Sequence, residues 1–194
     1  MSTATEKEAV WQGDRGWDDT PRDPADLVRL FAECFAEDYN TELVAGDGEP
    51  MYLAATDQRP AHILFAHGYF ASALHEIAHW LVAGGERRKK DDFGYWYLPD
   101  GRTQAQQAAF EKVEVKPQAL EWILATSCGF RFRFSADNLS GEPHDMGPFQ
   151  HNVWCQVQTH LRRGLPRRAR RFSQACAAFY GVTDPLDDAH YPEP

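Results

Sequence analysis

Two histidines four residues apart, with a glutamate between them, form the feature that most limits how this chain can fold. The segment His75-Glu76-Ile77-Ala78-His79 fits the pattern H-E-x-x-H. On a helix, positions i and i+4 project from the same face, so both imidazoles can reach one metal ion at a bond length of about 2 Å. The pattern therefore predicts a helix here that carries two metal ligands.

The residues around this pattern fit a short strand followed by a helix. Ile63-Leu64-Phe65-Ala66 is an apolar run of strand length, and the segment 71–81 is rich in helix formers. Gly84-Gly85 follows it, as is common at helix C-termini. The two histidines are therefore expected on a partly buried helix. The alternative is a helix that carries two histidines and binds no metal.

Length and composition indicate one globular domain. The chain has 194 residues, of which 43% are hydrophobic and 13% aromatic, enough for one well-packed core. The net charge of −9 argues against a general nucleic-acid binder, because phosphate binding normally needs a basic domain. The cysteines have no C-x-x-C pattern and are expected to be reduced, buried thiols. They are Cys34, Cys128, Cys155 and Cys176.

The chain carries no sequence signal for export or membrane insertion. Its N-terminus lacks the basic and apolar regions of a signal peptide, and no apolar run approaches the roughly 20 residues that span a bilayer. We therefore expect a cytoplasmic protein that does not bind membranes.

The remaining segments predict an α+β fold that is mostly helical with a small sheet. Helices are expected to begin at Asp23-Pro24 and at Thr103 and to cover about 148–163 and 166–180, with a kink or restart at Pro117. Strands are expected at 42–44 and 51–53 and, from strict alternation, at 130–134. We divide the chain into a flexible extension (1–22), a folded domain (23–182) and an acidic, Pro-containing tail (183–194).

A metal ion needs a third protein ligand besides the two histidines. Glu114 is the preferred candidate, because it lies 35 residues beyond His79 and can return on a second helix packed against the first. Glu111, one helical turn away, is the reserve candidate, and Glu121, beyond the proline, is the less favoured one. His67 could line the site as a proton donor or substrate contact, or it could be structural. The other histidines have no partner at ligand spacing and are expected at the surface.

Two histidines and one glutamate suit two kinds of metal chemistry. With zinc, the fourth position holds a water and Glu76 acts as the general base, as in metallopeptidases. With ferrous iron, the same ligands leave one face open for oxygen and substrate, as in non-haem oxygenases. The spacing alone does not distinguish between the two.

Several longer stretches resemble one family, the elongation factor P hydroxylases of bacteria. Together they extend over much of the chain from about 31 to 120, which makes the resemblance far more specific than H-E-x-x-H alone. They are 31–41 (FAECFAEDYNT), 46–53 (GDGEPMYL), 65–80 (FAHGYFASALHEIAHW), 92–97 (DFGYWY) with 99–102 (PDGR), and 110–111 (FE) with 113–120 (VEVKPQAL).

The resemblance implies a non-haem, metal-dependent hydroxylase. Such an enzyme uses molecular oxygen to hydroxylate a lysine of elongation factor P that has already received a β-lysyl group. It also implies a site of two histidines and one glutamate, which falls on His75, His79 and a glutamate of the segment 111–114. Ferrous iron is then the expected metal, with zinc as the alternative, and elongation factor P is the expected partner.

Two further segments are candidates for partner and substrate binding. Six arginines near the last predicted helix junction could dock an acidic protein, or could lie at a helix end and on a solvated face. They are Arg162, Arg163, Arg167, Arg168, Arg170 and Arg171. The aromatic block Tyr95-Trp96-Tyr97 could hold a cationic modified lysine by cation–π contact, or could belong to the core.

Overall fold

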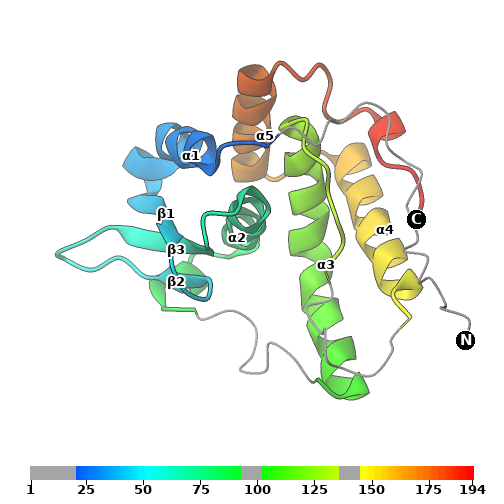
Figure 1. Ribbon diagram of the computed structural model, residues 1–194, viewed down its shortest axis with the longest axis horizontal. Helices are drawn as coiled ribbons and strands as arrows, with labels where there is room; N and C mark the ends of the chain where they lie inside the picture. Colours follow the sequence, from blue (N-terminus) through cyan, green and yellow to red (C-terminus); the bar gives the residue numbers. More distant parts are fainter. Residues whose placement is uncertain (1–20, 93–101, 136–144) are drawn as a thin grey trace, which may run out of the picture.

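In the residues that it describes, the computed structural model of this chain contains a three-stranded sheet and five α-helices (Figure 1). The structure describes residues 21–92, 102–135 and 145–194. Tyr95, Trp96 and Tyr97, His144, and nearly all of the expected extension 1–22 lie outside the described residues. The elements are α1 (Pro24–Tyr39), β1 (Thr41–Gly46), β2 (Met51–Leu53), β3 (Ala61–Ala66), α2 (Phe70–Val82), η1 (Arg87–Lys89), α3 (Gln104–Ser127), α4 (Gly147–Arg163), α5 (Arg167–Tyr180) and η2 (Asp188–His190).

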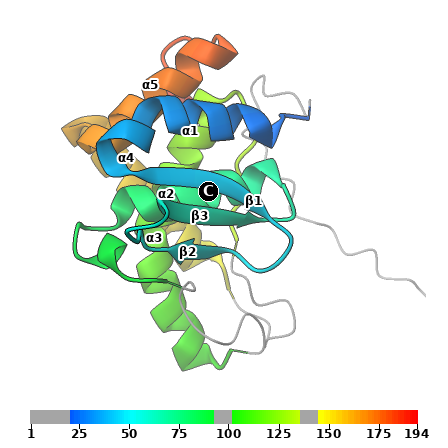
Figure 2. The ribbon, with the colours of Figure 1, turned by 90° about the vertical axis from the view of Figure 1, so that its left-hand side faces the viewer.

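The sheet has the strand order β1-β3-β2, with the strand that precedes the H-E-x-x-H helix in its centre (Figure 2). β1 pairs with β3 in parallel from Thr41↔Ala61 onward, and β2 pairs with β3 antiparallel from Met51↔Leu64 onward. After β3, the chain turns through His67 (φ 50°) and Gly68 (φ 65°), both left-handed. This sharp turn returns α2 onto the sheet.

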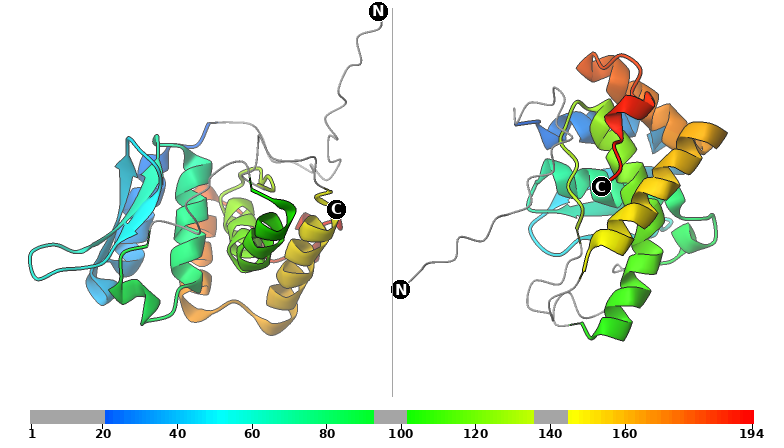
Figure 3. Two further views of the ribbon diagram at one scale, coloured as in Figure 1. Left: turned by 90° about the horizontal axis from the view of Figure 1, so that it is seen from below. Right: turned by 90° about the vertical axis from the view of Figure 1, so that its right-hand side faces the viewer.

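The H-E-x-x-H helix lies in the middle of the molecule. Seen from below, the sheet, α2, α3 and α4 follow one another as successive layers (Figure 3). The packing contacts agree, because α2 touches β3 on one side and α3 on the other, and α3 also touches α4. Helices α1 and α5 pack on each other and on α2, and α1 also packs against β1 and α5 against α3. The fold is therefore the expected α+β, mostly helical single domain.

An aromatic cluster fixes α2 against α1 and α5. Phe31 lies with its ring centroid 5.0 Å from Phe35, 5.0 Å from Trp80 and 6.0 Å from Phe172. All four side chains are buried, and edge-on arrangements of this kind suit the charge distribution of aromatic rings. Trp80 directly follows His79, so this cluster fixes the end of α2 that carries the second histidine.

Two predictions need correction: the restart of the helix at Pro117 and the strand at 130–134. α3 runs through Pro117 as one helix of 24 residues, so the predicted restart does not occur. A proline has a backbone angle that suits a helix and removes one internal hydrogen bond, and here its ring is buried, where packing offsets that loss. The predicted strand at 130–134 is also wrong: Phe132 stacks on Trp122 at 5.3 Å, and Phe134 contacts the same ring edge-on.

The cysteines follow the sequence-based expectation with one exception. All four cysteines are free thiols, but Cys155 on α4 is exposed, whereas the other three are buried as expected. The i, i+4 positions of α4 explain this, because Cys155 lies on the same face as the exposed His151. Within the described part of the chain, no helix is both long and apolar enough to cross a membrane.

Candidate metal centre

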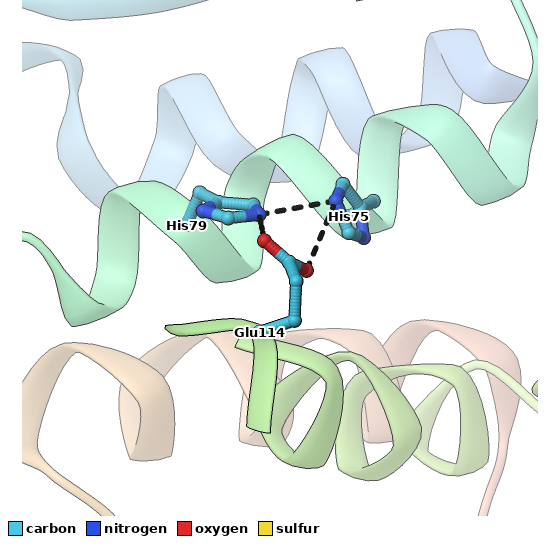
Figure 4. A group of neighbouring side chains, drawn as sticks. All are labelled: His75, His79 and Glu114. Carbon is cyan, nitrogen blue, oxygen red and sulfur yellow. Dashed lines mark hydrogen bonds and ion pairs between the residues drawn. The ribbon is translucent and has the colours of Figure 1, made fainter. Parts of the chain in front are cut away.

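His75, His79 and Glu114 converge on one point between α2 and α3 (Figure 4). The Nε2 atoms of the two histidines are 3.0 Å apart. Oε1 of Glu114 lies 3.2 Å from Nε2 of His79, and Oε2 lies 3.7 Å from Nε2 of His75. Among the residues that the structure describes, these three form the only group of at least three potential metal-ligating side chains with this proximity.

The three distances fit ligands of a single ion. Ligand atoms at about 2.1 Å from an ion lie about 3.0 Å apart at octahedral angles and about 3.4 Å apart at tetrahedral angles. The 3.0 Å between the two Nε2 atoms and the 3.2 Å from Oε1 of Glu114 to His79 fall in this range. The 3.7 Å to His75 is measured from the other carboxylate oxygen, Oε2, and is slightly wider. Two imidazoles and one carboxylate form a donor set that binds zinc or ferrous iron. The residues present therefore fit such an ion.

The three side chains differ in their exposure. The carboxylate of Glu114 is 2% exposed, whereas His75 is 21% and His79 is 25% exposed. The buried glutamate thus closes one side of the group, and the histidines border solvent. Burial alone would raise the pKa of Glu114, but the hydrogen bond from His79 and the nearby imidazoles hold that pKa below its usual value. Glu114 is therefore a carboxylate at neutral pH, as a metal ligand must be.

A fourth residue, Glu121, completes the surroundings of His75. Its Oε2 atom lies 2.8 Å from Nδ1 of His75, on the side of the ring opposite to Nε2. Burial acts to lower the pKa of His75, but the charge and hydrogen bond of Glu121 outweigh it and raise that pKa well above its usual value. Glu121 was the less favoured candidate for a ligand, and the structure places it beside Nδ1 of His75, outside the converging group.

Gln118 links the buried carboxylate to the segment that follows α3. Its Nε2 atom lies 2.7 Å from the carbonyl oxygen of Ser135 and 3.5 Å from Oε2 of Glu114. Its Oε1 atom accepts a hydrogen bond from the backbone N–H of Ser135 at 3.2 Å. Glu114, Gln118 and Glu121 follow the spacing i, i+4, i+7, so one face of α3 supplies all three side chains. The sequence reading missed Gln118 entirely, although this spacing was visible in it.

The structure separates the remaining candidates from this group. Glu111 accepts a hydrogen bond from Gln107 at 3.1 Å and does not belong to the converging side chains, so the geometry favours Glu114 over it. His67 lies exposed in the turn before α2, with its ring 5.9 Å from that of Tyr69, and is not part of the group either. Glu76 is half-buried, and burial raises its pKa above the usual value.

The arginines at the junction of α4 and α5 do not all face solvent. Arg168 is half-buried and donates hydrogen bonds to three carbonyl oxygens at the end of α2. Arg171 pairs with Asp38, and Arg167 donates to the hydroxyl oxygen of Tyr39. Five of the six side chains are exposed: Arg162, Arg163, Arg167, Arg170 and Arg171. The structure therefore assigns Arg168 a role inside the fold and leaves five arginines on the surface.

The fold and the converging side chains define the class of protein, a mostly helical α+β protein in which two histidines of an H-E-x-x-H helix and one glutamate could hold a metal ion. The model of the Elongation factor P hydroxylase family matches residues 30–191. The Elongation factor P lysine hydroxylase of Haemophilus influenzae is 56% identical over 167 residues, which cover 86% of this chain and 94% of that protein. The chain therefore belongs to the elongation factor P hydroxylase family, as its sequence motifs predict.

Proposed function

We propose that this protein hydroxylates a lysine side chain of elongation factor P. The observation that carries this proposal is the convergence of two half-exposed histidines and one buried glutamate in a chain of this family. The close relative is named for the same reaction. The family gives no support to the alternative of a zinc metallopeptidase, for which H-E-x-x-H by itself is the usual signature.

We further propose that His75, His79 and Glu114 hold a ferrous ion and that molecular oxygen is the co-substrate. Two imidazoles and one carboxylate on one side of an ion leave coordination positions open on the other, as in non-haem iron oxygenases. A bound ferrous ion would supply the activation of oxygen. In the reaction, one oxygen atom enters a C–H bond of the lysine side chain and the other leaves as water, with two electrons and two protons from a reductant.

The charges around the group favour a cationic substrate. Glu76, Glu114 and Glu121 surround the two histidines, so that a divalent ion leaves the group with an excess of negative charge when all three are ionised. A lysine that carries a β-lysyl group, as the family resemblance implies, presents ammonium groups to such a site. Glu76 and His67 stay as candidates for proton transfer, and Tyr95-Trp96-Tyr97 as candidates for substrate contact.

The exposed arginines are the proposed contact for the protein partner. Arg162, Arg163, Arg167, Arg170 and Arg171 lie on the surface at the junction of α4 and α5, where they can attract an acidic surface of the partner and steer its approach. Because a translation factor is the substrate, we place the reaction in the cytoplasm, with no membrane and no nucleic acid taking part.

Mass spectrometry of elongation factor P tests the proposed function. The protein is loaded with ferrous iron without oxygen and then mixed with β-lysylated elongation factor P, a reductant and isotopically labelled oxygen. We expect the factor to gain the mass of one labelled oxygen atom at its modified lysine. His79→Ala, which removes one ligand from the exposed side of α2, is expected to give no gain. A factor that is unchanged by the iron-loaded protein, or cleavage of peptides that depends on zinc and Glu76, would contradict the proposal.

A further inference from the structure

Among the described residues, the shortest hydrogen bond to any of the three converging side chains comes from a residue outside the group. Glu121 lies 2.8 Å from Nδ1 of His75, and its side chain is only 12% exposed. The Glu121 carboxylate acts as the acceptor, so Nδ1 of His75 carries the hydrogen in this contact. A hydrogen bond with an ionised partner is stronger than one between neutral groups, so this contact restricts the His75 ring.

This contact fixes the orientation of the His75 ring and therefore the direction of its other nitrogen, Nε2. With Nδ1 occupied by Glu121, the ring presents Nε2 to the space shared with His79 and Glu114, at 3.0 Å and 3.7 Å from their nearest ligand atoms. A histidine that binds a metal typically donates its second N–H to a carboxylate or carbonyl, which fixes the tautomer and raises the basicity of the ligand nitrogen. The Glu121-His75 pair has this form.

The position of Glu121 follows from the continuity of α3 through Pro117. Glu121 is seven residues beyond Glu114, so both lie on one face of the helix, two turns apart. α3 packs along α2, so the two carboxylates meet His75 from two sides: Glu114 at Nε2 and Glu121 at Nδ1. A break in the helix at the proline would change the direction of Glu121.

We propose that Glu121 is a positioning residue that fixes His75 with Nε2 toward the metal and Nδ1–H toward its own carboxylate. This inference rests on the proposed metal site and adds a residue that acts through His75 and does not itself bind the metal. A single helix, α3, thereby supplies one ligand and the support for a second.

Zinc titration of three variants tests this inference without use of the hydroxylation reaction. We expect Glu121→Ala to bind zinc about 10- to 100-fold more weakly than the unaltered chain. In Glu121→Gln, the amide oxygen can still accept the Nδ1–H bond without the negative charge, so its loss should be smaller. Glu111→Gln, on the same helix and outside the converging group, is the matched control and should bind zinc as the unaltered chain does. Circular dichroism verifies that each variant is folded.

Nitrogen and proton NMR of the zinc-loaded protein gives a second reading, specific to the ring. The Nδ1 proton of His75 is expected as a slowly exchanging, strongly deshielded resonance, lost or shifted in Glu121→Ala and retained in Glu111→Gln. An unchanged resonance in Glu121→Ala, or equal loss of zinc affinity in Glu121→Ala and Glu111→Gln, would overturn the inference. So would an unaltered chain that binds no zinc through His75. A chain that binds zinc in this way and leaves elongation factor P unmodified would overturn only the proposed function.

Discussion

Replacing Glu114 with glutamine is expected to abolish hydroxylation and to weaken metal binding by more than about 100-fold, because a direct ligand should contribute more than the supporting residues around it. The amide has the shape of the carboxylate, but it brings no negative charge to the ion. Glu114 is 2% exposed and accepts a hydrogen bond from His79, so water cannot reach this position to compensate for the lost negative charge. The measurements are zinc or ferrous iron titration and the mass of elongation factor P after reaction.

Glu111→Gln is the matched control for this substitution. It changes the same chemical group one helical turn away, at a residue that accepts a hydrogen bond from Gln107 and lies outside the converging group. We expect metal affinity and hydroxylation close to those of the unaltered chain. If Glu111→Gln lost metal binding and Glu114→Gln retained it, the third ligand would be Glu111, and the assignment of Glu114 would be wrong.

Removal of the Arg168 side chain is expected to lower the free energy of unfolding by about 2 to 3 kcal/mol, in line with charged hydrogen bonds to buried carbonyls. Its guanidinium donates to the carbonyl oxygens of Trp80, Leu81 and Ala83 at 3.2, 3.2 and 2.8 Å. These carbonyls end α2, where the partial negative charge of the helix favours a cation. The guanidinium also lies 4.4 Å from the centre of the Trp80 ring. Urea denaturation of Arg168→Ala measures the loss.

Arg162→Ala is the comparison that separates stability from partner binding. Arg162 is exposed on α4, so its removal should change the free energy of unfolding by no more than about 0.5 kcal/mol. In the proposed docking surface it should instead reduce the rate of reaction with elongation factor P at low salt. Equal stability of Arg168→Ala and Arg162→Ala would show that Arg168 does not fix the end of α2.

The part of the fold nearest the metal-binding group was predictable because two local patterns agree there. The apolar run 63–66 and the helix-forming segment 71–81 became β3 and α2, with boundaries within a residue or two. The spacing of His75 and His79 requires only the geometry of one helix. The position of Glu114 was harder to predict. It depends on how α3 packs on α2, whereas sequence spacing shows only which residues share one face of a helix.

The two errors in the predicted secondary structure have a common physical cause, since burial outweighed the local rule in each. Pro117 was expected to kink its helix or to make it restart, and the helix does not restart, because burial of the proline ring offsets a loss of about 3 kcal/mol. Phe132 and Phe134 alternate as a strand would, but they pack on Trp122, and alternation does not show whether a neighbouring strand is present. The expected break at Pro117 also hid Glu121, because only a continuous helix brings it onto the face of Glu114.

The most direct test of the metal centre is the position of an ion in a crystal of the protein loaded with ferrous iron and kept from oxygen. Anomalous diffraction at the iron edge should show one peak about 2.1 Å from Nε2 of His75, from Nε2 of His79 and from a carboxylate oxygen of Glu114. The Nδ1 atom of His75 should still face Glu121. A peak bonded to Glu121 or Glu111 in place of Glu114, or the absence of any peak between α2 and α3, would contradict the account.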